Sequence, residues 1–92
     1  MEQMSEENKQ LALRHIEALN AGDGATVARL AHPDLVDHAP PDGVRIEPLD
    51  IVAEDDRVVV RARAGVHIWR FSGRQIVEHW CFDGDDRGRR QA

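Results

Sequence analysis

GVHIWRFSGRQIVEHWCFD, residues 65–83, is the stretch that decides the fold of this chain and holds its unusual chemistry. Two runs rich in β-branched and aromatic residues flank Ser72-Gly73, a pattern that predicts a β-hairpin. The stretch contains all four aromatic residues of the 92-residue chain, two of its five histidines and its only cysteine. We therefore expect the functional site on this hairpin.

The length of the hairpin loop decides which side chains share a face, because a shift of one residue turns one strand over. A two-residue loop, Ser72-Gly73, would place the odd-numbered residues of the first strand with the even-numbered residues of the second; a three-residue loop, 72–74, would place odd with odd. The odd-numbered residues are His67, Trp69 and Phe71, then Val77, His79, Cys81 and Asp83. The even-numbered ones of the second strand are Ile76, Glu78, Trp80 and Phe82. Turn chemistry alone leaves both registers open.

Two short helices are predicted before the strands. Ser5 can cap the first, with Glu6 and Glu7 at the positive end of the helix dipole. Apolar residues then recur at steps of three and four until Asn20-Ala21-Gly22 ends the helix. That stripe is Leu11, Ala12, His15, Ile16 and Leu19, with His15 as a packing residue. Asp23 is predicted to cap a second helix that stops at His32-Pro33.

The remaining elements are predicted as strands. Residues 34–38 form a brief run that ends in a turn cluster at 39–43. Residues 44–53 and 57–64 are expected to pair as a hairpin. The order of elements predicts a single α+β domain over residues 1–92, with two helices on one face of an antiparallel sheet and a frayed tail at 85–92.

Composition narrows the class of protein. A chain of this length buries only about 60–65% of its unfolded surface, so association with a second copy is plausible. The formal charge is −5, and the basic residues are scattered, so we expect no nucleic acid partner. The N-terminus is acidic and polar, and no apolar run approaches the ~20 residues of a membrane span. We expect a cytoplasmic protein with no membrane partner, in which Cys81 makes no internal disulfide.

Three segments together resemble the SnoaL-like polyketide cyclases of the NTF2-like superfamily. They are NKQLALRHIEALNAGDGATVARLAHPDLVDHAPP at 8–41, IVAEDDRVVVRA at 51–62, and FSGRQIVEHW at 71–80 with a trailing Arg90-Gln91. The resemblance implies a curved antiparallel sheet wrapped around helices, a cone with a pocket, and dimers formed through the outer face of the sheet. It also implies cofactor-free and metal-free proton transfer, such as intramolecular aldol ring closure, with a pocket aspartate as acid/base.

The chain departs from that family in two ways. It resembles an unusually short member that lacks the third helix, expected after Pro41, and part of the sheet, expected between Arg63 and Gly65. We therefore expect an incomplete pocket and a homodimer, with exchanged strands as one way to cover it. The family's aspartate usually follows the tryptophan of E-H-W, where this chain has Cys81. The family's longer loop favours the register that brings His67 and His79 together.

Three residues are candidates for catalysis. His79 and His67 can take and give a proton near neutral pH, and Asp83 could orient an imidazole or replace the missing aspartate. Each of them could instead make an ordinary hydrogen bond or end a solvated strand. Cys81 with His79 and Asp83 could also bind zinc, although no turn-borne ligand pair supports a metal site.

Four residues are candidates for binding a substrate: His38, Trp69, Phe71 and Cys81. His38 matches a histidine that lines the pocket mouth in the resembled family, Trp69 and Phe71 could wall an aromatic ligand, and Cys81 could be a small buried side chain. Trp80 and Phe82 would then serve a subunit interface, or all the aromatic residues could be core.

Three functions follow from these residues. The first is a cofactor-independent cyclase or isomerase that acts on a small, largely apolar carbonyl compound. The second is a non-catalytic ligand-binding or assembly module on the same frame, and a metal-dependent variant is third. The fold does not choose among them, because one fold hosts many chemistries.

Overall fold

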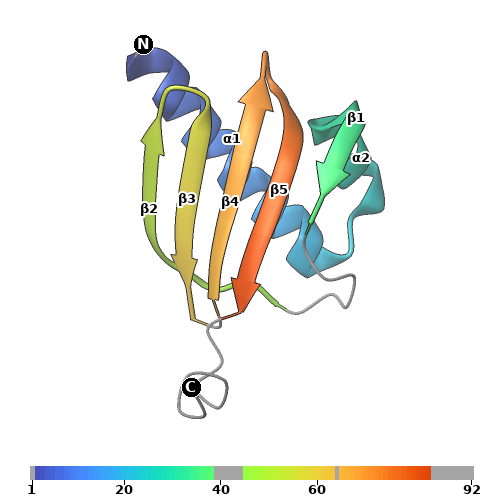
Figure 1. Ribbon diagram of the computed structural model, residues 1–92. Helices are drawn as coiled ribbons and strands as arrows, with labels where there is room; N and C mark the ends of the chain where they lie inside the picture. The colour runs from blue at the N-terminus through green and yellow to red at the C-terminus, as the bar shows by residue number, and fades with distance from the viewer. Residues whose placement is uncertain (1, 39–44, 64, 84–92) are drawn as a thin grey trace.

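The computed structural model describes the backbone of residues 2–38, 45–63 and 65–83, and the side chains of 5–38, 45–63 and 65–82. Its helices and strands are α1 (Glu2–Ala21), α2 (Gly24–Leu30), β1 (Ala31–Asp37), β2 (Pro48–Glu54), β3 (Arg57–Ala62), β4 (Gly65–Ser72) and β5 (Gln75–Asp83) (Figure 1). The strands form one sheet in the order β1-β5-β4-β3-β2. The turn cluster predicted at 39–43 and the tail predicted at 85–92 lie outside the described residues.

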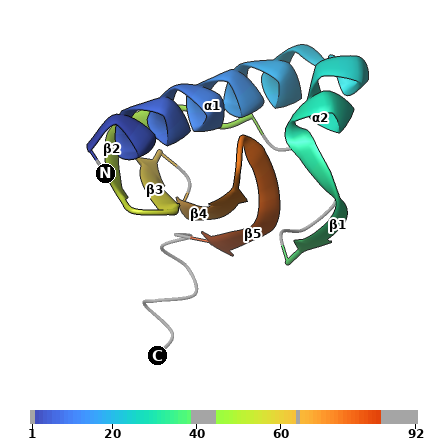
Figure 2. The same cartoon turned by 90° about the horizontal axis from the view of Figure 1, so that it is seen from above.

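The predicted α+β class is confirmed, with both helices on one side of a curved sheet (Figure 2). Strands β2 to β5 are antiparallel neighbours, as expected. Strand β1 instead lies parallel to β5, which makes the sheet mixed. These two strands are far apart in the sequence, so no tight turn forces them to run in opposite directions.

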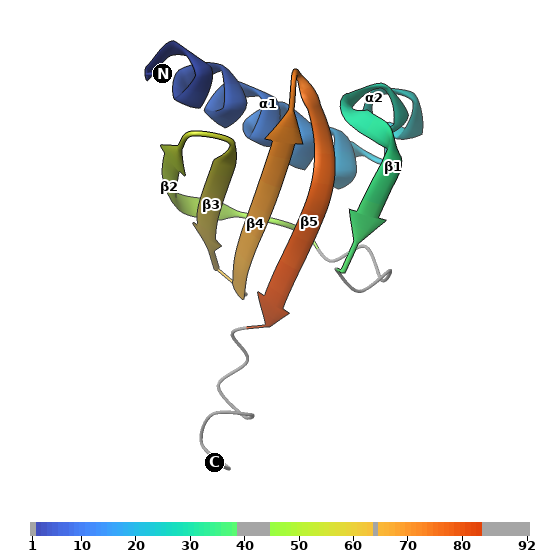
Figure 3. The ribbon, with the colours of Figure 1, turned by 45° about the horizontal axis from the view of Figure 1, so that its top comes forward.

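Helix α1 crosses the sheet diagonally (Figure 3) and ends where the sequence predicted. It begins at Glu2, before the expected cap at Ser5. Gly22 follows it with φ +71°, and its N–H donates to the Leu19 carbonyl while the Asp23 N–H donates to the Ala18 carbonyl. This is a Schellman motif, for which a left-handed glycine is well suited.

The buried stripe of α1 was predicted well except at its last turn. Ala12, His15 and Ile16 are buried, whereas Leu19 is 39% exposed. Asn20 instead holds the chain next to this turn, because its side chain donates to the Ile46 carbonyl and accepts from the Ile46 N–H, both at 2.8 Å. These two bonds fix the approach to β2, which begins at Pro48, later than the start of the predicted 44–53 run, and ends at Glu54.

Asp23 caps α2 as predicted. Its carboxylate accepts from the Thr26 N–H at 3.2 Å and from the Thr26 hydroxyl at 2.7 Å. Helix α2 then ends at Leu30, and β1 begins at once at Ala31. The His32-Pro33 pair that was expected to stop the helix therefore lies within β1. No helix among the described residues is long and apolar enough to span a membrane.

The hairpin of β4 and β5 contains a β-bulge that sets which side chains share a face. Its loop is Gly73-Arg74, because Ser72 pairs with Gln75 and Phe71 with Ile76. The register shifts before the next pair, Arg70 with Glu78, and leaves Val77 as the extra residue. Gly73 has φ +64°, which suits the first position of a two-residue type II′ turn.

Neither predicted loop forms, but beyond this bulge the odd-numbered residues of both strands share a face, as the three-residue loop would have arranged them. Trp69 pairs with His79, and His67 pairs with Cys81. The extra residue sits in the strand and not in the loop, so Phe71 and Ile76 can both be buried near the turn while His79 and Cys81 also face α1. The side facing α1 is called the inner face below, and the opposite side the outer face.

The inner face forms the core. Burial alternates along β3, so Val58, Val60 and Ala62 point inward. With residues of α1, α2, β4 and β5 and with Ile46, which precedes β2, they make one cluster: Ala12, Ile16, Leu30, Ile46, Val58, Val60, Ala62, Trp69, Phe71 and Ile76. The outer face carries a row of four paired apolar residues, Val52, Val59, Ile68 and Trp80.

Candidate functional site

A chain of hydrogen bonds crosses the inner face at β1, β5 and β4. His79 Nδ1 lies 3.2 Å from Asp37 Oδ1, and His79 Nε2 lies 3.1 Å from His67 Nδ1. The free end of the second ring, His67 Nε2, lies 3.7 Å from Cys81 Sγ. The chain therefore joins a carboxylate, two imidazoles and a thiol.

One proton arrangement satisfies every link with both rings neutral. A carboxylate can only accept a hydrogen bond, so His79 Nδ1 carries a proton and donates to Asp37. The bare His79 Nε2 must then accept from His67 Nδ1–H. This leaves His67 Nε2 bare and facing Cys81, so the thiol donates to it. The tautomers are thus assigned from the hydrogen-bond pattern.

Burial keeps these imidazoles neutral. Burial, with a smaller contribution from the nearby His79 and an opposing one from Asp37, lowers the pKa of His67 from 6.5 to about 4. The pKa of His79 is lowered by burial too, against the opposing effect of the Asp37 carboxylate and its hydrogen bond. At neutral pH both rings are therefore uncharged and can accept a proton. Forming the charged imidazolium costs free energy, because it is buried away from water.

Stacked and edge-on aromatic rings surround this series of hydrogen bonds. The His67 and His79 rings stack with centroids 5.3 Å apart, and Trp69 stacks on His79 at 5.0 Å. His15 of α1 meets the His79 ring edge-on at 5.8 Å and accepts a 3.0 Å hydrogen bond from Trp69 Nε1. His15 is buried, as its packing role requires.

The strand pairing explains why these residues meet. His67 and Cys81 are directly opposite in the β4–β5 ladder, and Trp69 is opposite His79. In the parallel ladder Asp37 is the partner of His79, and a 2.7 Å bond from the His38 N–H to the His79 carbonyl fixes this end of β1. Each functional side chain is thus held by a regular strand, which favours a defined geometry.

Four of the predicted site residues come together: His67, His79, Trp69 and Cys81. Phe71 lies next to the hairpin loop and is 3% exposed, among the core residues. The side chain of Asp83 lies outside the described residues, and its backbone pairs with Gly65.

His38 is not brought to this cluster. Its ring stacks on Trp80 with centroids 5.4 Å apart, and its Nε2 lies 2.9 Å from Glu78 Oε2. Glu78 also accepts two hydrogen bonds from Arg70, at 3.0 and 3.2 Å. Because Asp37 faces inward, its neighbour His38 meets residues of the outer face. The structure therefore separates His38 from the two inner histidines.

Asp37 is the functional residue that sequence reasoning missed. Alternation in the strand holds a usable signal, since Asp37 and His38 must point to opposite sides and only one can join the inner histidines. Which of the two points inward depends on how β1 joins the sheet, and that pairing is long-range.

Within the described residues, no group of three or more histidine, cysteine, aspartate or glutamate side chains is placed to hold a metal ion. The contacts give the reason: His79 uses both ring nitrogens for Asp37 and His67, so neither nitrogen points to a shared centre.

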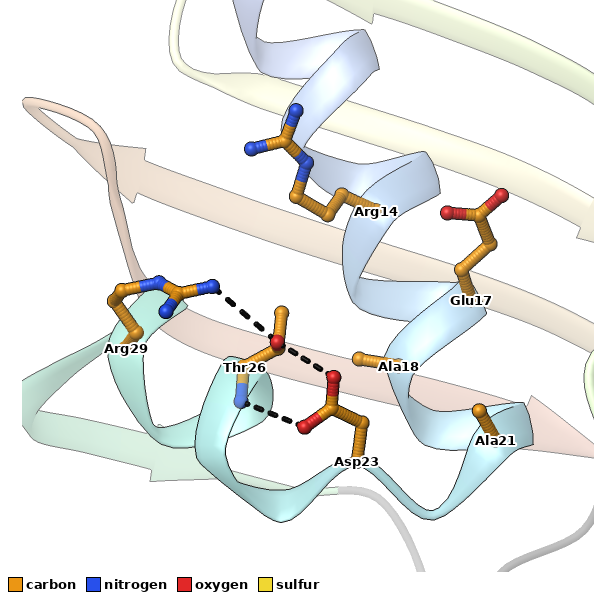
Figure 4. Close-up of a pocket in the computed structure, with 7 residues that line it drawn as sticks. All are labelled: Arg14, Glu17, Ala18, Ala21, Asp23, Thr26 and Arg29. Atoms are coloured by element: carbon orange, nitrogen blue, oxygen red, sulfur yellow. Dashed lines mark hydrogen bonds between the residues drawn. The ribbon is translucent and has the colours of Figure 1, made fainter.

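A separate groove of about 430 Å³ lies between α1 and α2 (Figure 4). Its lining residues are Arg14, Glu17, Ala18, Ala21, Asp23, Thr26 and Arg29. The groove contains none of the imidazoles, and its two arginines are balanced by two carboxylates. We therefore place the candidate site at the hydrogen-bond chain.

No protein-family model matches this sequence, and no curated protein matches it. Solved structures match in fold. Bal32a, from a soil-derived mobile gene cassette, has a TM-score of 0.78 at 16% identity, over 89% of this chain and 92% of that one. An NTF2-like protein of unknown function from Burkholderia pseudomallei K96243 has a TM-score of 0.71 at 19% identity, over 91% and 95%.

A third similar structure, from Sinorhizobium meliloti, is described as a "putative polyketide cyclase". Its TM-score is 0.68 at 15% identity, over 79% of this chain and 94% of that one. Identities this low carry the fold and not the activity. With two helices on the inner face of a curved five-stranded sheet, the protein has the NTF2-like fold.

Proposed function

We propose that this protein is a SnoaL-like, cofactor-independent cyclase or isomerase that moves a proton on a small, largely apolar carbonyl compound. The observation that carries the proposal is the hydrogen-bonded series Asp37, His79 and His67 on the inner face. Such a series presents a base, holds it in one orientation and offers a place for the charge that the base acquires.

His67 is the group best placed to meet a substrate. Both ring nitrogens of His79 are engaged, and the residue is only 4% exposed. His67 is partly exposed, and the hydrogen-bond contact of its Nε2 among the described residues is the long 3.7 Å one to Cys81. His67 Nε2 therefore takes the proton next to a carbonyl group and returns it to the product.

His79 and Asp37 position this base. When His67 gains a proton at Nε2, its Nδ1 proton can move to His79 Nε2 along the 3.1 Å hydrogen bond. The positive charge then lies beside the Asp37 carboxylate, where opposite charges stabilise it. Removal of the Asp37 carboxylate should therefore make His67 a weaker base while leaving the contacts between protein and substrate unchanged.

The surroundings favour an uncharged substrate. The described inner-face residues of β3, β4 and β5 are apolar apart from His67, His79 and Cys81, with no lysine or arginine among them. Trp69 and Val60 lie beside the imidazoles and offer apolar contacts. A ketone or similar carbonyl compound fits this lining better than an anion.

A non-catalytic binding module is the second candidate. The observation in its favour is that the pKa of His67 falls to about 4 through burial, so this imidazole is a weaker base than a free one. Cys81 also stands where the resembled family has its acid/base aspartate. In either case we place the protein in the cytoplasm, in keeping with a single cysteine outside any disulfide.

Exchange of α-hydrogens for deuterium in small aromatic ketones and polyketide mimics, followed by NMR in D₂O, separates these candidates. We expect wild-type protein to catalyse the exchange and His67→Gln to lose about 10²- to 10⁴-fold, the usual share of a general base. Asp37→Asn should lower the rate and change its pH profile. Asparagine can still accept the hydrogen bond from His79, but it carries no negative charge to stabilise a protonated imidazole. The outer-face variant His38→Gln should exchange at the wild-type rate.

Circular dichroism and ligand titration accompany these rates. Binding of the ketones by all variants, with no exchange above buffer in wild type, would replace the enzyme with the binding module.

A further inference from the structure

The contact between Cys81 and His67 gives this site a second reactive group. The two residues face each other across the β4–β5 ladder, with Sγ 3.7 Å from Nε2. The thiol is partly exposed and in no disulfide. The feature is therefore a thiol with an imidazole base beside it and a carboxylate-supported second imidazole behind that base.

We propose that Cys81 is a nucleophile with His67 as its base, and that the site forms a thioether with a small uncharged α,β-unsaturated carbonyl compound. The inference shares His67 with the proposed function but does not need turnover of any substrate.

The direction of the hydrogen bonds supports this role. The Asp37 carboxylate sets the tautomer of His79, which sets that of His67 and leaves its Nε2 bare toward the thiol. A thiol that donates to a bare imidazole nitrogen has a proton acceptor in place when it attacks. His15 of α1, the other titratable group that meets these rings, also stays neutral, since burial lowers its pKa to about 4.

The chemistry balances without a further reactant. Cys81 Sγ bonds to the β-carbon of the acceptor, and the electrons of the carbon–carbon double bond move to the carbonyl oxygen as an enolate. The thiol proton passes to His67 Nε2 and from there to the α-carbon. The product is a saturated carbonyl compound joined to Cys81 by a carbon–sulfur bond.

The surroundings select the class of electrophile. Val60 is opposite His67 in the β3–β4 ladder, and Ala62 is opposite Gly65 one step further along the same face. These side chains are small, apolar and buried, and no cation lies among the described residues of this face to hold an anionic group. A soft, neutral carbon electrophile matches a thiol in such a place.

Acrylamide addition, followed by intact-mass spectrometry at pH 7, tests the pair. Wild type should react about 10-fold or more faster than His67→Gln, in line with loss of a general base. The matched variant His38→Gln, altered on the outer face, should react at the wild-type rate, and Cys81→Ser should give no adduct. Equal rates in wild type and His67→Gln would overturn the inference.

A second measurement needs no substitution. The rate of wild-type alkylation by iodoacetamide should hold well below pH 7, because His67 accepts the thiol proton. A single rise with a midpoint at or above about 8.5, the value of an unassisted thiol, would overturn the inference even where every variant failed to fold.

These readouts keep the two proposals apart. A reactive thiol in a protein without α-hydrogen exchange would count against the proposed enzyme alone. Unassisted thiol chemistry in a protein that does exchange α-hydrogens would count against the nucleophile alone.

Discussion

His15 shows how one buried side chain links stability to pH. It accepts the Trp69 indole hydrogen bond and is 4% exposed, so its ring must stay neutral in the fold. Burial, with a contribution from nearby His79, lowers its pKa from 6.5 to about 4. Between these two pH values the unfolded chain binds more protons than the folded one.

Acid should therefore destabilise the protein well above the pH at which carboxylates titrate. The stability that His15 contributes is fully present above pH 6.5 and is lost as the pH falls toward about 4, on the order of 3 kcal/mol for this residue. His67 and His79 act in the same direction. Urea midpoints at pH 7.5 and 5.0 measure the loss.

The matched variants are His15→Gln and His38→Gln. Glutamine at position 15 can still accept the Trp69 hydrogen bond but does not titrate, so it should lose less stability on acidification than wild type. His38→Gln should keep the wild-type loss, since it leaves all three inner imidazoles in place. A wild-type midpoint that stays constant over this range would contradict the assignment.

The β4–β5 hairpin shows how a turn and a bulge together set a register. The type II′ loop requires a positive φ at Gly73, and the bulge near Val77 then turns the far part of β5 over. A cluster of His67, His79 and Cys81 on one face depends on both features.

Gly73→Ala should destabilise the protein by about 1 kcal/mol, because a left-handed backbone is strained for a residue with a Cβ. No atom lies within 4 Å of the added methyl group, so the strain is the whole effect. Gly73→Asn should lose less, since asparagine tolerates this region better.

Gly24→Ala is the control for this change. Gly24 also has open space for a methyl group, but it lies in the first turn of α2 and not at a positive φ. Alanine there should be neutral or slightly stabilising. Equal urea midpoints for Gly73→Ala and wild type would show that the turn does not hold the hairpin.

The outer face of the sheet suggests how the protein associates. A row of paired apolar residues, Val52, Val59, Ile68 and Trp80, crosses four strands. Val52 is 64% exposed, and Phe82, two residues after Trp80 in β5, is 55% exposed. Contiguous apolar surface of this kind is typical of an interface. We propose that two copies of the chain pack through this row as a homodimer.

Light scattering should give about twice the 10.4 kDa chain mass in a micromolar dilution series. Val59→Glu should shift the protein to monomer, because two buried like charges would meet across a symmetric interface. Ala28→Glu, on the exposed surface of α2, should leave the mass unchanged. A wild-type protein that stays monomeric at these concentrations would remove the homodimer.

The sequence by itself determined the helices, the two hairpins and the outline of the site. Local signals suffice for these, because an Asp23 cap, a left-handed Gly22 and the alternation of strand residues act over a few neighbours. The same signals placed His67 and His79 on one face of the sheet in one of two registers.

The tertiary structure decided the rest. It placed the extra hairpin residue in a bulge, turned Asp37 inward beside His79, and carried His38 to the outer face. The physical reason is that an edge strand with a distant partner has no turn to fix its direction or register. Its position follows from which side chains can be buried together with α1 and the rest of the sheet, and a local sequence pattern does not contain that information.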